Sequence, residues 1–125
     1  MENIKDKYFS RATTYNVFET GLEIYDRKRP RVITVDEWSE VVFYAANGQG
    51  TVKKFIDYLL NEYPNISADK LKKAIISRIK GMHRNGFIKL SDHPVQLPPY
   101  LDKPLFEQDP EVYRKQMLDD GFIKE

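Results

Sequence analysis

Few side chains in this sequence are placed to do covalent or metal chemistry. There is no cysteine, and the two histidines, His83 and His93, lie ten residues apart with no carboxylate at metal-ligand spacing to either. The segment Gly48-Gln49-Gly50-Thr51 has the glycines of a phosphate-binding loop but lacks the preceding strand and the lysine of that motif. The acidic pair Asp119-Asp120 has no partner residues that would make it a general acid and base. We therefore expect no enzymatic activity, no metal and no cofactor.

The residues that could carry a binding function are cationic and lie close together. Between residues 70 and 89 there are seven basic side chains and no acidic one, although the net charge of the chain is only +1. From residue 92 to the end, eight acidic residues stand against four basic ones. The basic face could be simply solvated, could contact nucleic acid, or could attract an acidic peptide. Because lysines dominate it, and lysine suits phosphates better than base edges, specific recognition of DNA is the weaker alternative.

Three predicted helices must position this cationic face. The first starts near Asp36, with Thr34 or Asp36 as its cap, and stops at Asn47-Gly48. The second runs from the cap Thr51 to Pro64 and has a strong apolar stripe at helical spacing. The third begins after Ser67, its predicted cap, stops at Asn85-Gly86 and carries the basic residues. Residues 87–90 then leave as an extended segment.

Short strands precede the helices. Apolar and polar residues alternate through 14–25, interrupted by Gly21, which indicates two short strands or a bulged hairpin. A third strand is predicted at 31–35, where β-branched residues are frequent. After Leu90 the proline-rich stretch 91–104 predicts an extended strap, and Asp109-Pro110 opens a final short helix.

The expected organisation is an α+β, winged-helix-like domain. Three short antiparallel strands are followed by three helices, and a proline-rich strap and a short C-terminal helix are added. We expect a flexible N-terminus at 1–13, the domain at 14–90, and the strap and C-terminal helix at 91–125. No apolar run is long enough for a membrane span, and the first residues lack the apolar core of a secretion signal, so a cytoplasmic protein is expected.

A free sheet edge beside the third helix would suit an extended peptide. The strand at 31–35 comes just before the first helix, so its edge could run beside the third helix and accept another strand. Acidic side chains of that peptide would meet Arg31, Arg78 and the lysines. If the peptide pairs with this strand, a proline at Ile33 should abolish binding by removing a ladder donor.

Two stretches of the helical block resemble a known family. V-V-F-Y-A-A-N-G-Q-G-T-V-K-K-F-I-D-Y-L-L-N-E-Y-P, followed by I-I-S-R-I-K-G-M-H-R-N-G-F-I, resembles the PqqD-like peptide chaperones, also called precursor-peptide recognition elements of ribosomal natural-product pathways. The matching segments are Trp38 to Gly48, Thr51 to Pro64 and Ser67 to Ile88. The family's leucine-asparagine pair before the first helix is replaced here by Thr34-Val35-Asp36, and residues 91–125 lie outside the family core.

The resemblance implies a non-catalytic peptide chaperone. It would capture the leader segment of a precursor peptide as an additional strand and present it to a modifying enzyme such as a radical S-adenosylmethionine enzyme. The alternatives are a winged-helix DNA-binding regulator, with nucleic acid the less expected partner, and a non-catalytic interaction module of a larger complex. The peptide-binding residues that the resemblance implies are Arg31, Val32, Ile33, Thr34, Val35, Ala74, Ile75 and Arg78.

Overall fold

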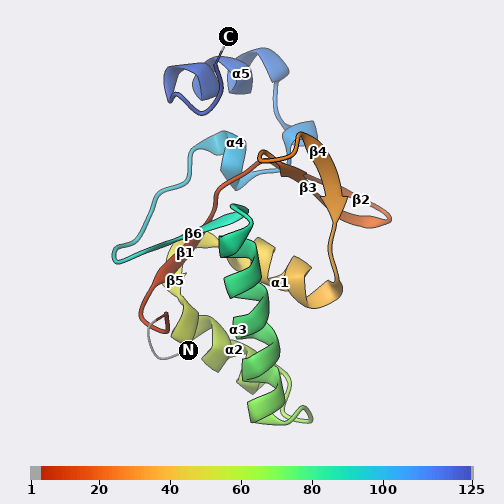
Figure 1. Ribbon diagram of the computed structural model, residues 1–125, viewed down its shortest axis with the longest axis vertical. Coiled ribbons are helices and arrows are strands. Elements are labelled where there is room, and N and C mark those ends of the chain that lie inside the picture. Colours follow the sequence, from red (N-terminus) through yellow and green to blue (C-terminus); the bar gives the residue numbers. More distant parts are fainter. Residues whose placement is uncertain (1–3, 125) are drawn as a thin grey trace.

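The computed structural model describes residues 4–124, and it has an α+β fold, as expected. Within these residues, six strands form two antiparallel three-stranded sheets, which combine with five α-helices and one 3-10 helix. The three central helices, α1 to α3, gather on one side of the first sheet (Figure 1). The second sheet and the C-terminal helices lie towards the opposite end of the molecule (Figure 1). No helix in this part of the chain has the length and apolar character to cross a bilayer.

The first sheet has the order β5-β1-β6, with β1 (Tyr8–Arg11) at its centre. Its partners are β5 (Asn47–Thr51) and β6 (Ile88–Ser91), both far away in the sequence. Phe9 is almost completely buried, and its ring lies 5.4 Å from the ring of Phe55. The expectation of a flexible N-terminus at 1–13 is therefore wrong for residues 8–13, because long-range pairing and burial order a segment with little local signal.

The second sheet has the order β2-β3-β4, formed by β2 (Tyr15–Phe18), β3 (Gly21–Asp26) and β4 (Arg31–Thr34). This arrangement confirms the predicted hairpin and third strand. Gly21 has a φ of +125°, and a Cβ there would lie 2.8 Å from the Glu40 carboxylate, which accepts a hydrogen bond from the backbone N–H of Leu22. Leu22 and Ile24 are fully buried on the inner face of this sheet.

The three central helices confirm most predicted boundaries. Helix α1 (Glu37–Ala45) is capped by Asp36, and α2 (Val52–Glu62) is capped by Thr51. Helix α3 (Ala68–Arg84) follows Ser67, whose side chain makes no capping hydrogen bond. The segment between α1 and α2, where the sequence predicts only a helix stop and a helix cap, forms β5 because it pairs with β1. Thus four strands precede α1, one follows it and one follows α3, rather than three strands followed by three helices.

The C-terminal segment is less extended than the prolines predicted. It contains α4 (Pro99–Asp102), the 3-10 helix η1 (Leu105–Glu107) and α5 (Pro110–Asp119), the last capped by Asp109 as expected. Prolines at the first position of α4 and α5 are compatible with a helix because no N–H is needed there. These elements share a small apolar cluster of their own, made of Leu97, Tyr100, Leu101 and Met117.

The C-terminal segment is tied to the rest of the molecule at several points. Gly48 of β5 has a φ of +81°, and its carbonyl accepts a hydrogen bond of 2.8 Å from Val95 N–H. A Cβ at Gly48 would meet the Val95 carbonyl oxygen at 2.2 Å, so only glycine allows this close approach. The buried Arg11 side chain donates to the carbonyl oxygens of Leu101 and Phe43, which joins α4 to the end of α1.

Candidate functional site

Strand β4 lies at an edge of its sheet, and its hydrogen-bonding pattern leaves donors and acceptors free. Tyr25 of β3 donates its N–H to Thr14, and its carbonyl accepts from the Thr13 hydroxyl, so its backbone groups point towards β2. Tyr25 lies opposite Val32 of β4. Because the backbone groups of Tyr25 point towards β2, Tyr25 and Val32 form a non-hydrogen-bonded pair between β3 and β4. By strand alternation, the backbone N–H and C=O groups of Val32 and Thr34 point away from the sheet, whereas those of Ile33 point towards β3.

The chain's own C-terminal segment covers other strands and not this edge. On β2, the side chain of Asn16 accepts a hydrogen bond from Phe106 N–H, and on β5 the Gly48 carbonyl accepts from Val95 N–H. Within residues 4–124, the backbone pairing of β4 is with β3 alone. Strand β4 lies in front of its sheet in Figure 1. The open edge of β4 is therefore accessible to another chain.

A groove of about 400 Å³ runs between β4 and α3. Helix α3 has two adjacent stripes: Ile75, Ile79 and Met82 face the core, and residues 77, 78, 81 and 85 lie beside them towards β4. The second stripe brings polar and small residues to the wall of the groove. The floor of the groove is apolar. The groove is lined by side chains from β4 and the residue after it, from α3, and from the segment that follows α3. Among them are Ile33, Val35, Arg78, Met82, Arg84 and Phe87.

Arg78 is held over this groove by the cap of α1. Its guanidinium lies 2.9 Å from one carboxylate oxygen of Asp36, whose other oxygen accepts the Ser39 N–H at 2.8 Å. Hydrogen bonds from Ser39, with a further contribution from Arg78, lower the pKa of Asp36 below its ordinary value of 3.8. The groove thus has a positioned cation at its wall, with Arg84 further along α3.

Replacing Asp36 by alanine should lower the free energy of unfolding by about 1 kcal/mol at neutral pH, because α1 loses its cap. Since the pKa of Asp36 is lower in the folded chain than in the unfolded one, its contribution is present above about pH 4 and is lost as the pH falls through the folded pKa. Urea titrations between pH 7 and about pH 3 should therefore show the wild type and Asp36→Ala converging. Asp36→Asn is the control, since an amide oxygen can still cap without titrating. Parallel curves for wild type and Asp36→Ala would contradict the role assigned to the ionised carboxylate.

The structure brings together only part of the predicted residue set. Ile33, Val35 and Arg78 line the groove. Val32 and Thr34 offer their backbone groups at the edge, but their side chains face the other side of the sheet. Arg31 turns towards the buried Asp26, with its Nε 3.2 Å from the carboxylate, so it is a structural ion pair and not part of the groove wall.

The two other predicted helix positions need correction. Ile75 is fully buried in the core and has no surface to offer a peptide. Ala74 is half-buried and does not line the groove; its carbonyl lies 3.4 Å from Arg78 Nη1. The prediction placed the wall about one turn too early on α3.

Sequence reasoning missed several groove residues, including Gly81, Met82, Arg84 and Phe87. A signal was present, because positions 81 and 85 follow Arg78 at helical spacing on one side of the core stripe. The orientation of the Ile33 backbone had no such signal. It depends on which residues of β3 direct their backbone N–H and C=O groups towards β2 and which direct them towards β4. Because the Ile33 N–H points towards β3, a proline at Ile33 would disrupt the sheet itself and would not test peptide binding.

In the described part of the chain, the two histidines and the glycine-containing segment 48–51 are not arranged as a metal site or a phosphate-binding loop. His83 and His93 are both exposed, and residues 4–124 contain no group of three or more His, Asp or Glu that could hold a metal ion. Gly48-Gln49-Gly50-Thr51 belongs to β5, and Thr51 also caps α2. The groove beside β4 is therefore the site from which a function can be argued.

Comparisons with known proteins leave this chain without an assigned family: no family model, no curated protein and no solved structure matches it significantly. The likeness to PqqD-like chaperones and to winged-helix domains stays a prediction.

Proposed function

We propose that this protein binds an extended peptide by strand addition at the open edge of β4, without catalysing a reaction itself. The observation that carries the proposal is the pair of outward-facing residues, Val32 and Thr34, beside a groove of about 400 Å³. An exposed edge is a template for another strand, and proteins without such a use commonly block it with charge, proline or a covering segment. Here the covering segment protects other strands.

Backbone pairing would supply affinity, and the groove would supply selectivity. Alternate side chains of the added strand would face α3, where Ile33, Met82 and Phe87 favour apolar groups. Arg78 and Arg84 would favour an acidic side chain among them. The acidic partner would have to compete with Asp36 for Arg78, so its contribution would be modest at this exposed site.

The peptide proposed is the leader segment of a ribosomally made precursor, which this protein would present to a modifying enzyme. This assignment rests on the resemblance of the α1–α3 block to PqqD-like chaperones, which implies a peptide site between the third strand and the third helix. A radical S-adenosylmethionine enzyme is the proposed class of partner. The acidic C-terminal segment offers a surface distinct from the groove for contact with such an enzyme.

The proposal can be tested by selecting displayed random peptides on the full chain and titrating the enriched ones by calorimetry. Peptides with alternating side chains should be enriched, and their affinity should fall only slightly between low and high salt because backbone pairing and apolar contacts dominate. Duplex DNA should bind weakly, if at all. Failure to enrich any peptide, together with DNA binding whose affinity falls steeply with salt, would reject the proposal in favour of a nucleic-acid function.

A further inference from the structure

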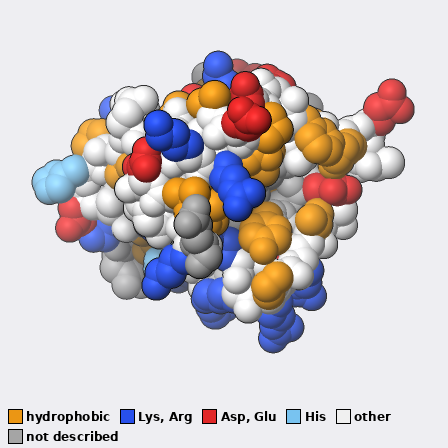
Figure 2. Space-filling model, turned by 90° about the horizontal axis from the view of Figure 1, so that it is seen from above, with side chains coloured by type: hydrophobic (Ala, Val, Ile, Leu, Met, Phe, Trp, Pro, Cys, Tyr) orange, Lys and Arg blue, Asp and Glu red, His pale blue; other side chains and the backbone are white. Residues whose placement is uncertain are grey.

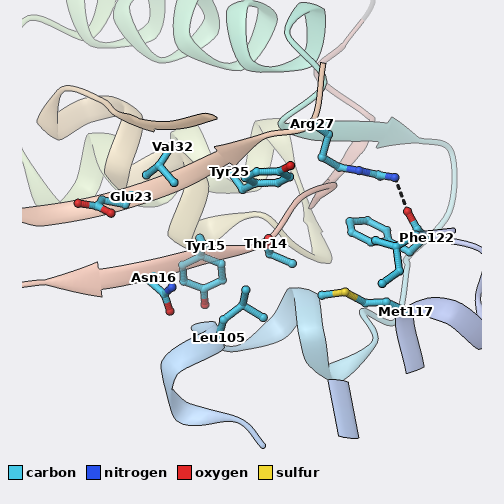
Figure 3. A pocket seen from close by; sticks show the side chains of 11 residues that line it. Thr14, Tyr15, Asn16, Glu23, Tyr25, Arg27, Val32, Leu105, Met117 and Phe122 are labelled. Atoms are coloured by element: carbon cyan, nitrogen blue, oxygen red, sulfur yellow. Dashed lines mark hydrogen bonds between the residues drawn. The ribbon is translucent and has the colours of Figure 1, made fainter. Parts of the chain in front are cut away.

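A second hollow lies on the opposite face of the β2-β3-β4 sheet from the groove. Its volume is about 290 Å³, and it separates the outer face of the sheet from the C-terminal segment. Tyr25 and Val32 border it from the sheet, and Leu105, Met117 and Phe122 face them from the C-terminal elements (Figure 3). The surface that lines it is mostly apolar, and Val32 is 57% exposed beside it.

The far wall of this hollow is fixed in position. The Arg27 guanidinium lies 3.7 Å from the centre of the Phe122 ring and also donates to the Phe122 carbonyl (Figure 3). The Tyr15 hydroxyl donates to the Asp102 carbonyl at 3.1 Å. Tyr100, in the apolar cluster behind this wall, donates to Asp120 at 2.8 Å, and its burial, together with that hydrogen bond, raises its pKa to about 12. The hollow is thus held open by defined contacts on both sides.

Apolar surface elsewhere at this end of the molecule is interrupted by charge. Seen from the side of the C-terminal helices, hydrophobic side chains are interspersed with Lys, Arg, Asp and Glu (Figure 2). The hollow differs from these scattered groups because it is concave and adjoins the open edge of β4 through Val32.

The register of β4 connects the hollow with the peptide site. Side chains of an added strand alternate between the two faces of the extended sheet. Those level with Ile33 would enter the α3 groove, whereas those level with Val32 would lie on the outer face, about 5 Å from Val32 across the new strand pair. An outer-face side chain that is long enough can therefore reach over Val32 into the hollow.

We propose that the bound peptide carries a large apolar side chain, aromatic or leucine-like, level with Val32, and that this side chain fills the hollow under the C-terminal segment. This inference rests on the proposed strand addition at β4 and deepens it by naming the residue class that the outer face selects. It also gives the C-terminal segment a role, since Leu105, Met117 and Phe122 would form one side of a two-sided clamp whose other side is α3.

The test uses a random peptide library displayed on phage, selected on the full chain, followed by fluorescence anisotropy with labelled synthetic copies of the enriched peptides. A large apolar residue should recur at one fixed position. Replacing it by alanine should weaken binding by about tenfold. Val32→Trp, which puts a bulky ring at the mouth of the hollow, should weaken the original peptide to a similar extent but leave the alanine version unchanged. Val17→Trp is the matched control, since it places the same ring at an exposed valine of β2 that lines neither the groove nor the hollow, and it should bind both peptides like the wild type.

The possible outcomes separate this inference from the proposed function. If enriched peptides lose binding to the edge variant Thr34→Pro but show no fixed apolar position and no response to Val32→Trp, the hollow has no role and the inference alone fails. If no peptide is enriched, or if enriched peptides are indifferent to Thr34→Pro, strand addition fails and the inference fails with it. Circular dichroism checks that each variant is folded.

Discussion

Replacing Arg11 by methionine is expected to lower the free energy of unfolding by about 3 to 5 kcal/mol. The Arg11 side chain is only 4% exposed, and its guanidinium lies between the ends of α1 and α4. Nε donates to the Leu101 carbonyl at 2.7 Å, and Nη1 donates to the carbonyls of Phe43 and Tyr44, both at 3.0 Å. Methionine fills a similar volume but leaves the Leu101 carbonyl without the donor that Arg11 supplies, takes one of two donors from the Phe43 carbonyl, which keeps the Ala46 N–H, and removes the bond to the part-buried Tyr44 carbonyl. A buried group left unsatisfied costs about 1 to 3 kcal/mol.

Urea unfolding of the full chain, followed by circular dichroism, measures this effect. The matched control is Arg29→Met, which removes the same charge from an exposed turn position and should change stability by less than about 0.5 kcal/mol. Loss of the Arg11 bonds should also release α4, so the near-ultraviolet signal, to which Tyr100 contributes, should change before the helices of the core unfold. Equal stabilities of the two variants would contradict the assignment of Arg11 as the link between the core and the C-terminal segment.

Replacing Thr34 by proline should weaken peptide binding by at least about a hundredfold while leaving the fold intact. The outward N–H of Thr34 is one of the few donors that β4 can offer to a new strand, and proline removes it. The pyrrolidine ring would also keep an incoming backbone at a distance. Proline is tolerated on an edge strand when its nitrogen faces solvent, which is the situation of Thr34 and not of Ile33.

Two variants make this result interpretable. Thr34→Val removes the hydroxyl but keeps the N–H, so it should bind selected peptides like the wild type. Ile33→Pro should instead lower stability, because the Ile33 N–H faces β3 within the sheet. If Thr34→Pro bound a selected peptide with unchanged affinity, the peptide would be held elsewhere, and the β4 edge would lose its assigned role.

The sequence was sufficient to predict those elements whose boundaries are set by residues within or next to the element. The caps at Asp36, Thr51 and Asp109, the apolar stripe of α2 and the turn at Gly21 all lie in the structure where the sequence predicts them. In each of these cases the side chain that determines the boundary contacts its own element or the one next to it.

The elements that the sequence did not predict depend on partners far along the chain. Strand β5 reads N-G-Q-G-T, which has no strand propensity, and it is extended because Thr51 and Asn47 pair with β1. Strand β1 contains a buried arginine, whose acceptors lie in α1 and α4 and cannot be inferred from its neighbours.

The candidate site also has features that local patterns predict and features that depend on distant residues. That β4 and α3 would meet was predictable, because strand, helix and charge all had local patterns. Which face of α3 meets the groove depends on the packing of Ile75 and Ile79 into the core, and which residues of β4 point outwards depends on the pairing of Tyr25 with Thr14. The hollow beside Val32 required the position of the C-terminal segment, for which the prolines predicted only an extended chain.

Amide hydrogen exchange at Val32 and Thr34, followed by NMR in the free protein and with a saturating selected peptide, tests strand addition most directly. Both amides should exchange rapidly in the free chain and at least about tenfold more slowly in the complex, because each becomes a donor to the added strand. The Ile33 amide, already paired with β3, serves as the internal reference. Rapid exchange at Val32 and Thr34 in the fully bound protein would contradict the proposal that β4 accepts the peptide.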